Sequence, residues 1–237
     1  MIAAPPPSAV AVFGDRVVLA ERFAAWLTGP GITRGLLGPR EAEQVWERHL
    51  LNGVGMAALI EVGAIIVDLG SGAGLPGLPL LLARPDLQMV LVEPKARRAA
   101  FLAEVCADLD LPARVVRARA TPGGLVLLPE GTVGDVVPLA DVVTARAVAA
   151  IGELGRWAAP LLRPGGWLLA VKGSSAGAEL QRDRPGLSRL GFVEAQIRRV
   201  GSRRSETVHR QGASEAAARP TTATVVAMRW DPVSRET

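Results

Sequence analysis

A short glycine-rich run has the residue types and spacing of a cofactor site. Residues 70–74 read Gly-Ser-Gly-Ala-Gly and follow directly on the apolar segment 65–69. Glycines at such a turn let the chain bend tightly and let its backbone N–H groups approach a ligand closely. Glu93 ends the next apolar segment about 20 residues further on, where a carboxylate can accept both hydroxyls of a ribose. The combination predicts a site for a cofactor that contains a nucleoside.

The residue before the glycines separates two classes of cofactor. Residues 72–77 satisfy the pattern G-x-G-x-x-G of dinucleotide-binding turns, which leaves NAD as an alternative. Asp68 would repel a pyrophosphate, whereas its carboxylate can accept hydrogen bonds from an amino-acid ammonium, directly or through water. S-adenosylmethionine carries an ammonium, a carboxylate and a ribose but no phosphate. We therefore expect it to bind at Asp68, Gly70, Gly72 and Glu93, rather than NAD or a purely structural turn.

Basic residues at two predicted strand ends are candidates for positioning a substrate. Arg146 and Lys172 each follow a short apolar segment, and ligands of open α/β sheets bind at the carboxyl ends of strands. We expect these two, with Arg119, to contact phosphates or the cofactor carboxylate; the alternative is surface charge. Arginines near the C-terminus are candidates for RNA phosphates or for a solvated loop. They are Arg198, Arg199, Arg203, Arg204 and Arg210.

The pattern of apolar runs predicts the elements that must position these residues. Short apolar runs that alternate with helical patterns are typical of a mostly parallel, doubly wound α/β sheet. The predicted strands are 65–69, 89–92, 113–116, 142–144 and 167–171. The predicted helices between them are 78–83, 97–109 and 153–162. Two later segments, 191–198 and 222–229, could supply an antiparallel edge.

Helical patterns also precede the sheet. One helix is expected over 8–27, and a second begins after Gly38-Pro39 and carries His49 on an apolar face, where a packed core histidine is expected. We assign residues 1–7 to a disordered leader, 8–60 to N-terminal helices packed on the core, and 61–237 to the cofactor-binding domain. Loops are predicted over 123–134 and, rich in arginine, over 201–220.

Composition limits the compartment and the partners. The apolar stretches are shorter than the ~18 residues that a membrane span needs, and the N-terminus lacks a secretory pattern, so we expect a cytoplasmic protein. The single cysteine, Cys106, excludes a disulfide framework and a Cys-based metal site. After Leu180 the chain has 11 of its 27 Lys and Arg residues but only 6 of its 23 Asp and Glu residues. This basic excess indicates a polyanionic partner.

Several motifs together resemble those of one known family. The run 68–79, Asp-Leu-Gly-Ser-Gly-Ala-Gly-Leu-Pro-Gly-Leu-Pro, carries most of the resemblance, with Ala-Arg-Pro-Asp-Leu at 83–87. Further matches are 35–41, 48–52, 97–102, 144–147 and 169–173. With these motifs the chain resembles the RsmG (GidB) family of small-subunit ribosomal RNA guanine-N7 methyltransferases over about residues 32–175.

The resemblance implies a fold, a reaction and roles for residues. The fold is that of a Rossmann-like class I S-adenosylmethionine-dependent methyltransferase with an N-terminal helical extension, and the reaction is methylation of N7 of a guanine in the helix 18 loop of 16S rRNA. Gly70 and Leu75 match the cofactor turn, Ala120 and Thr121 the adenine contact, and Arg146 a cofactor or RNA contact. The chain departs from the family where Thr121-Pro122 replaces an acid, and in the tail beyond Gly177.

The expected chemistry needs alignment rather than acid–base catalysis. Guanine N7 already carries a lone pair, so its attack on a sulfonium methyl requires no general base. Cations should not crowd N7, so Arg119, Arg146 and Lys172 are better placed on phosphates, the cofactor carboxylate or guanine O6. The partner is 16S rRNA, the small subunit or an assembly intermediate, and a monomer without metal is expected. The alternatives are a methyltransferase for a small molecule or protein and a non-catalytic RNA-binding module.

Overall fold

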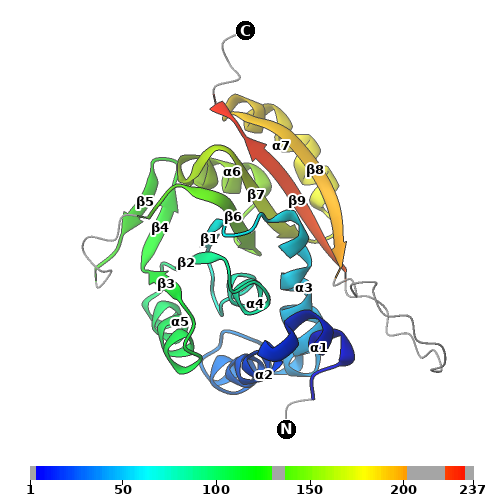
Figure 1. Cartoon of the computed structure of the whole chain (residues 1–237). Helices are drawn as coiled ribbons and strands as arrows, with labels where there is room; N and C mark the ends of the chain where they lie inside the picture. The colour runs from blue at the N-terminus through cyan, green and yellow to red at the C-terminus, as the bar shows by residue number, and fades with distance from the viewer. Residues whose placement is uncertain (1–3, 130–136, 202–221, 233–237) are drawn as a thin grey trace, which may run out of the picture.

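A twisted sheet lies at the centre of the computed structural model, which describes residues 4–129, 137–201 and 222–232 (Figure 1). Over these residues the sheet has seven strands in the order β3-β2-β1-β6-β7-β9-β8. The strands are β1 (Ile65–Leu69), β2 (Gln88–Val92), β3 (Ala113–Val116), β6 (Ala140–Arg146), β7 (Leu162–Lys172), β8 (Phe192–Gly201) and β9 (Thr222–Trp230). β3 to β7 run parallel along this order, whereas β9 is antiparallel to both of its neighbours. The predicted parallel core and antiparallel edge are confirmed.

The order of the strands reverses at β1. The chain moves outward from β1 through β2 to β3, then returns to the other side of β1 with β6 and β7. Ligands of open α/β sheets bind in the crevice at the carboxyl ends of the strands at such a switch point. Leu69 at the end of β1 lies beside Val92 of β2 and Ala145 of β6, so the residues that follow these three strands meet at one edge.

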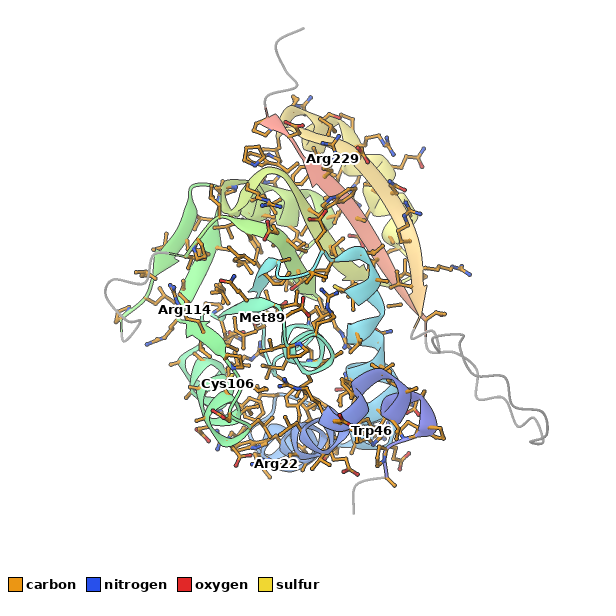
Figure 2. All side chains as sticks on the ribbon, viewed as in Figure 1. Arg22, Trp46, Met89, Cys106, Arg114 and Arg229 are labelled. Atoms are coloured by element: carbon orange, nitrogen blue, oxygen red, sulfur yellow. The ribbon has the colours of Figure 1, made fainter. Side chains whose placement is uncertain are left out.

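Helices cover both faces of the sheet, because alternate residues of each strand point to opposite sides. Ile66 and Val142 pack on one face with α4 (Gly77–Ala83) and α5 (Ala96–Asp108). Val67 and Val143 pack on the other face with α6 (Ile151–Ala158) and α7 (Ala176–Arg189). Figure 2 shows Met89 on β2 and Trp46 among the N-terminal helices. The predicted doubly wound architecture is confirmed.

The N-terminal layer is more broken than the sequence predicts. The helix expected over 8–27 is interrupted because Gly14 adopts φ +53°, which a regular helix does not contain. The layer consists of α1 (Pro7–Phe13), η1 (Gly14–Arg16), α2 (Val17–Trp26), η2 (Leu27–Gly31), η3 (Pro39–Gln44), η4 (Val45–Leu51), α3 (Asn52–Val54) and η5 (Gly55–Leu59). Trp26 attaches this layer to α5: its ring meets Phe101 edge-on at 5.7 Å, and its Nε1 donates to Asp108 at 2.9 Å.

Three further elements, two strands and a helix, were not expected from the sequence. The loop predicted over 123–134 is wrong in its first part, because β4 (Ala118–Thr121) and β5 (Gly124–Leu127) pair as an antiparallel hairpin. Residues 130–136 of that loop lie outside the described residues. Helix α7 forms although Gly177, Pro185 and Gly186 are unfavourable inside helices. Its Leu180 and Leu187 are buried in the core on the same face of the sheet as Val67 and Val143, so tertiary packing outweighs local propensity.

Candidate cofactor and substrate site

The glycine turn is fixed at the carboxyl ends of β1 and β2. The carbonyl oxygen of Val92 accepts hydrogen bonds from the backbone N–H of Gly70 at 2.8 Å and of Ser71 at 3.1 Å. Gly70 has φ +65°, and a Cβ added there would lie 2.9 Å from Cγ2 of Val148. Gly72 has φ +59°. Glycine is therefore needed at Gly70 for both conformation and space, and at Gly72 for conformation.

Glu93 closes one side of this turn. The side chain is 2% exposed; its Oε2 accepts from the N–H of Gly72 at 3.0 Å, and its Oε1 accepts from the N–H of Lys95 at 2.9 Å. The structure thus brings together the two features that the sequence pairs, the glycine run and the acid after the next strand. A carboxylate fixed by two backbone donors is pre-organised for further hydrogen bonds from hydroxyl groups.

Asp68 lies beneath the turn rather than on its open side. The residue is fully buried, and its Oδ1 accepts from the hydroxyl of Thr144 at 2.7 Å. Its Oδ2 faces the backbone of Gly77 and accepts no well-formed hydrogen bond from any described residue. Burial raises the pKa of Asp68 to about 6, against the hydrogen bond from Thr144, which lowers it. The predicted contact with a ligand ammonium stays a prediction.

Asp68 gives the folded state a defined pH dependence. Because its pKa is raised from 3.8 to about 6, the folded chain keeps a proton that the unfolded chain loses in this range. The stability from Asp68 is therefore present below pH 3.8 and is lost as the pH rises through about 6. As the pH rises through this window, the free energy of unfolding of Asp68→Asn should increase relative to that of the parent protein by on the order of 2–3 kcal/mol. Chemical denaturation between pH 4 and pH 8 measures the difference.

The difference in the free energy of unfolding between the parent and Asp68→Asn separates the effect of Asp68 from that of His49, whose pH dependence has the opposite sign. Burial lowers the pKa of His49 to about 4, so stability from His49 is present above pH 6.5 and is lost as the pH falls toward 4. This contribution is common to both proteins and cancels in the difference. Asp15→Asn, which removes an exposed carboxylate, is the matched control. A difference for Asp68→Asn that does not change between pH 4 and pH 6 would contradict the prediction.

The residues matched to the adenine contact lie on the β4–β5 hairpin. Ala120 and Thr121 are half-buried at the end of β4. The hydroxyl of Thr121 donates to the carbonyl oxygen of Gly124 at 2.9 Å and accepts from the N–H of Gly123 at 3.3 Å. This side chain is therefore engaged in its own turn, and the adenine contact expected at Ala120 and Thr121 stays a prediction. Leu75, also matched to the turn, is half-buried and packs against the core.

Arg146 and Lys172 end neighbouring strands but point to opposite faces of the sheet. Arg146 meets the N-terminal layer, where its Nη2 lies 3.0 Å from Nδ1 of His49. Lys172 meets α7 instead: its Nζ donates to the carbonyl oxygen of Ala149 at 2.7 Å and pairs with Glu179 at 2.7 Å. The Lys172 side chain is 12% exposed. The Lys172 ammonium is thus paired inside the protein. The phosphate contact expected from the sequence stays a prediction, and the pairing with Glu179 was not foreseen.

A cavity of about 560 Å³, shallow and widely open to solvent, lies beside Lys172, between the loop after β6 and helix α7. Its lining is Ala147, Val148, Ala149, Ala150, Lys172, Ser175, Glu179 and Arg182. Val148 also lies against Gly70, so the cavity adjoins the glycine turn. Its size falls within the roughly 300–1,000 Å³ of small-ligand sites. Sequence reasoning missed Glu179 and Arg182 because it did not predict α7; the only local signal was their position after the last parallel strand.

The arginines expected to bind RNA are not gathered in one place. Arg119 is exposed on β4, near the β3 edge of the sheet, whereas Arg198 and Arg199 are exposed on β8 at the opposite edge (Figure 1). The other candidates, Arg203, Arg204 and Arg210, lie with loop 201–220 almost wholly outside the described residues. Within the described ranges, no helix is long and apolar enough to cross a membrane, and no cluster of three His, Cys, Asp or Glu side chains could hold a metal.

Comparison with solved structures identifies the class of fold. A protein described as a predicted O-methyltransferase from Agrobacterium tumefaciens matches with a TM-score of 0.51 at 16% identity, over 76% of this chain and 80% of that one. The tRNA methyltransferase TrmI from Aquifex aeolicus matches with a TM-score of 0.50 at 11% identity, over 75% and 66%. With its sheet order and glycine turn, the chain has the Rossmann-like fold of class I S-adenosylmethionine-dependent methyltransferases.

Comparison of sequences identifies the family within this class. Residues 17–208 match the GidB family, described as rRNA small subunit methyltransferase G. The protein named ribosomal RNA small subunit methyltransferase G in Mycolicibacterium gilvum is 46% identical over 200 residues, 84% of this chain and 85% of that one. Its namesake in Corynebacterium jeikeium is 47% identical over 209 residues, 88% and 90%. The chain belongs to the GidB family, and the expected resemblance is confirmed.

Proposed function

We propose that this chain transfers a methyl group from S-adenosylmethionine to N7 of a guanine in the helix 18 loop of 16S rRNA, in the cytoplasm. The observation that carries the proposal is the contact between Gly72 and Glu93 at the switch point of the sheet, in a chain of the GidB family. This contact joins the glycine turn to a buried acid, the two parts that a nucleoside with an amino-acid tail requires.

The residues present fit this cofactor. Gly70 carries no side chain, so its backbone can approach a ligand closely, and a Cβ there would clash with Val148. Glu93 would accept the ribose hydroxyls, and the backbone of Ala120 and Thr121 would meet the adenine. Asp68 Oδ2 is buried beside the backbone of Gly77 without a well-formed hydrogen bond from a described residue, so the carboxylate would reach a cationic ammonium through water.

The protein's part in the reaction is alignment. When bound, S-adenosylmethionine would supply an electrophilic methyl carbon: N7 would form the new C–N bond with its lone pair as the C–S bond breaks, and the electron pair of that bond would stay on sulfur. The chain's residues have no proton to remove, so they need only hold the two reactants at near-attack distance, which can supply roughly 7–11 kcal/mol in well-oriented cases. Both cations of the cavity lining are paired, Lys172 with Glu179 at 2.7 Å and Arg182 with Asp183 at 2.9 Å, which lessens repulsion of the charge that develops on the base.

The cavity beside Val148 is the proposed entry for the guanine, because it adjoins the glycine turn at the carboxyl ends of β6 and β7. The exposed Arg119, Arg198 and Arg199 would hold RNA phosphates on either side. Since each phosphate contact releases counterions, affinity for the RNA should fall steeply with salt. Recognition by phosphate and shape suits a chain with 4% aromatic residues and no tyrosine.

The test is transfer of labelled methyl from S-adenosylmethionine to small ribosomal subunits that lack the modification, with naked 16S rRNA assayed in parallel. Nuclease digestion then identifies the modified nucleoside and its position. We expect 7-methylguanosine in the helix 18 loop. The matched control is RNA in which 7-deazaguanine replaces guanine, because it lacks only the attacking nitrogen.

Three results would contradict the proposal in different ways. Label in rRNA at an exocyclic amine or a ribose would overturn the N7 assignment. Cofactor binding without label in any RNA would favour a small-molecule or protein substrate. RNA binding without affinity for the cofactor would favour a non-catalytic RNA-binding module.

A further inference from the structure

Arg146 points into the N-terminal layer, away from the cavity lining. Its Nη2 lies 3.0 Å from Nδ1 of His49, a residue 97 positions away in the sequence. Its Nη1 is buried, and no described residue accepts a hydrogen bond from it. Ala147, the next residue, has φ +54°, a left-handed conformation that costs a non-glycine residue about 1–2 kcal/mol. Backbone strain next to a residue with an unpaired buried donor is typical of functional sites.

His49 acts as a neutral acceptor in this contact. Arginine has only donors, so Nδ1 of His49 must accept, which places the ring proton on Nε2. The ring is 3% exposed, and Nε2 lies 3.9 Å from Oε2 of Glu41, too far for a hydrogen bond. The charged groups that face it are Glu41, Arg48 and Arg146. Burial, and then the charge of Arg146, lower the pKa of His49 to about 4, so the ring stays neutral at pH 7.

Stability alone does not account for this arrangement. A leucine at position 49 would fill the same buried space and would leave no Nε2–H unpaired. Burial of the Arg146 guanidinium lowers the pKa of Arg146, which means that the surroundings disfavour its charge. A buried cation with one unpaired N–H group costs free energy that a hydrocarbon would not. Burial of His49 and Arg146 therefore lowers the free energy of unfolding relative to hydrocarbon side chains at the same positions.

We propose that His49 is a positioning residue: its neutral ring holds the Arg146 guanidinium so that Nη1 faces an oxygen acceptor of a bound reactant. The register of β1 and β6 sets Leu69 beside Ala145, so Arg146 and Gly70 follow their strands at the same edge. The acceptor is an anionic oxygen, supplied either by the carboxylate of the cofactor or by a phosphate of the RNA. The inference rests on the proposed methyl transfer.

Asparagine and glutamine provide matched variants at position 49, because their side-chain amides reach different ring positions of histidine. His49→Asn sets an oxygen acceptor where Nδ1 lies, and His49→Gln sets its amide where Nε2 lies. His49→Leu removes both ring nitrogens and supplies no polar group. We expect His49→Asn to keep methyl transfer within about 3-fold of the parent per folded molecule, and His49→Gln and His49→Leu to lose about 10-fold or more, roughly the effect of one charge-assisted hydrogen bond.

A double-mutant cycle separates positioning from a general effect on folding. If His49 acts through Arg146, adding His49→Leu to Arg146→Lys causes little further loss, whereas independent effects multiply. Calorimetry with S-adenosylhomocysteine distinguishes the sources of the acceptor: a weaker Kd in His49→Leu indicates the cofactor carboxylate, and an unchanged Kd with a raised KM for the subunit indicates the RNA. Equal activity of the Asn and Gln variants, or multiplied losses in the cycle, would overturn the proposal.

A spectroscopic measurement keeps the inference independent of the activity. The chain contains two histidines, so ¹⁵N spectra of the parent and His49→Asn assign the His49 ring directly. We expect a neutral ring with its proton on Nε2 from pH 8 to pH 5. A ring protonated at pH 6 or above would overturn the positioning role even in an active enzyme. A ring with the expected tautomer in a protein that methylates no RNA would refute the proposed function alone.

Discussion

Gly70→Ala is expected to weaken binding of S-adenosylmethionine by roughly 100-fold, about 3 kcal/mol, and to abolish detectable methyl transfer. The added methyl would lie 2.9 Å from Cγ2 of Val148, closer than such atoms approach in proteins. Valine has a stiff side chain, so either the turn or the loop that carries Val148 must shift. Both line the proposed site. Calorimetric titration with S-adenosylmethionine and the subunit assay measure the two effects.

Gly63→Ala is the matched control for this prediction. Gly63 has φ +73°, close to the +65° of Gly70, but a Cβ there meets nothing within 4 Å. Both variants therefore carry similar backbone strain, about 1–2 kcal/mol, and only one crowds the site. We expect both to lose stability and only Gly70→Ala to lose the cofactor. Equal cofactor affinity in the two variants would show that the turn around Gly70 does not contact the ligand.

Features that depend on neighbouring residues could be predicted from the sequence. The five parallel strands and the glycine turn follow from short apolar runs and from the positions of glycines, which are properties of local segments. The acid at Glu93 was predictable because it must follow the strand beside β1. Its contact with Gly72 then follows from the parallel register of the two strands.

The remaining features depend on contacts between distant segments. His49 was expected to be a packed core residue; it is buried, but its contact with Arg146 joins the N-terminal layer to β6. Helix α7 forms over unfavourable glycines and a proline because Leu187 packs against Gly155, where a Cβ would lie 2.4 Å from Leu187 Cδ2. No local pattern contains either pairing. The role expected for Lys172 depended on α7 in the same way, since its partner Glu179 lies there.

Lys172→Met is expected to lower the free energy of unfolding by about 2–3 kcal/mol. The ammonium of Lys172 and the carboxylate of Glu179 lie 2.7 Å apart at 12% and 17% exposure, so removing one leaves a largely buried, uncompensated charge. Glu179 Oε2 also accepts from the N–H of Ile151 at 3.3 Å and thereby holds the start of α6. The second variant, Glu179→Gln added to Lys172→Met, should recover at least about half of the loss because it removes the unpaired charge.

The same variants decide whether Lys172 also holds RNA, as the sequence suggests. Removal of a phosphate contact reduces the slope of log affinity against log salt by about 1, whereas loss of an internal ion pair leaves the slope unchanged. We expect an unchanged slope for Lys172→Met, measured with small subunits at several salt concentrations well below its melting temperature. Lys95→Met removes the other lysine, which is exposed, and serves as the control for stability. A reduced slope without a loss of stability would instead assign Lys172 to the phosphates, and the pair with Glu179 would then have to open when RNA binds.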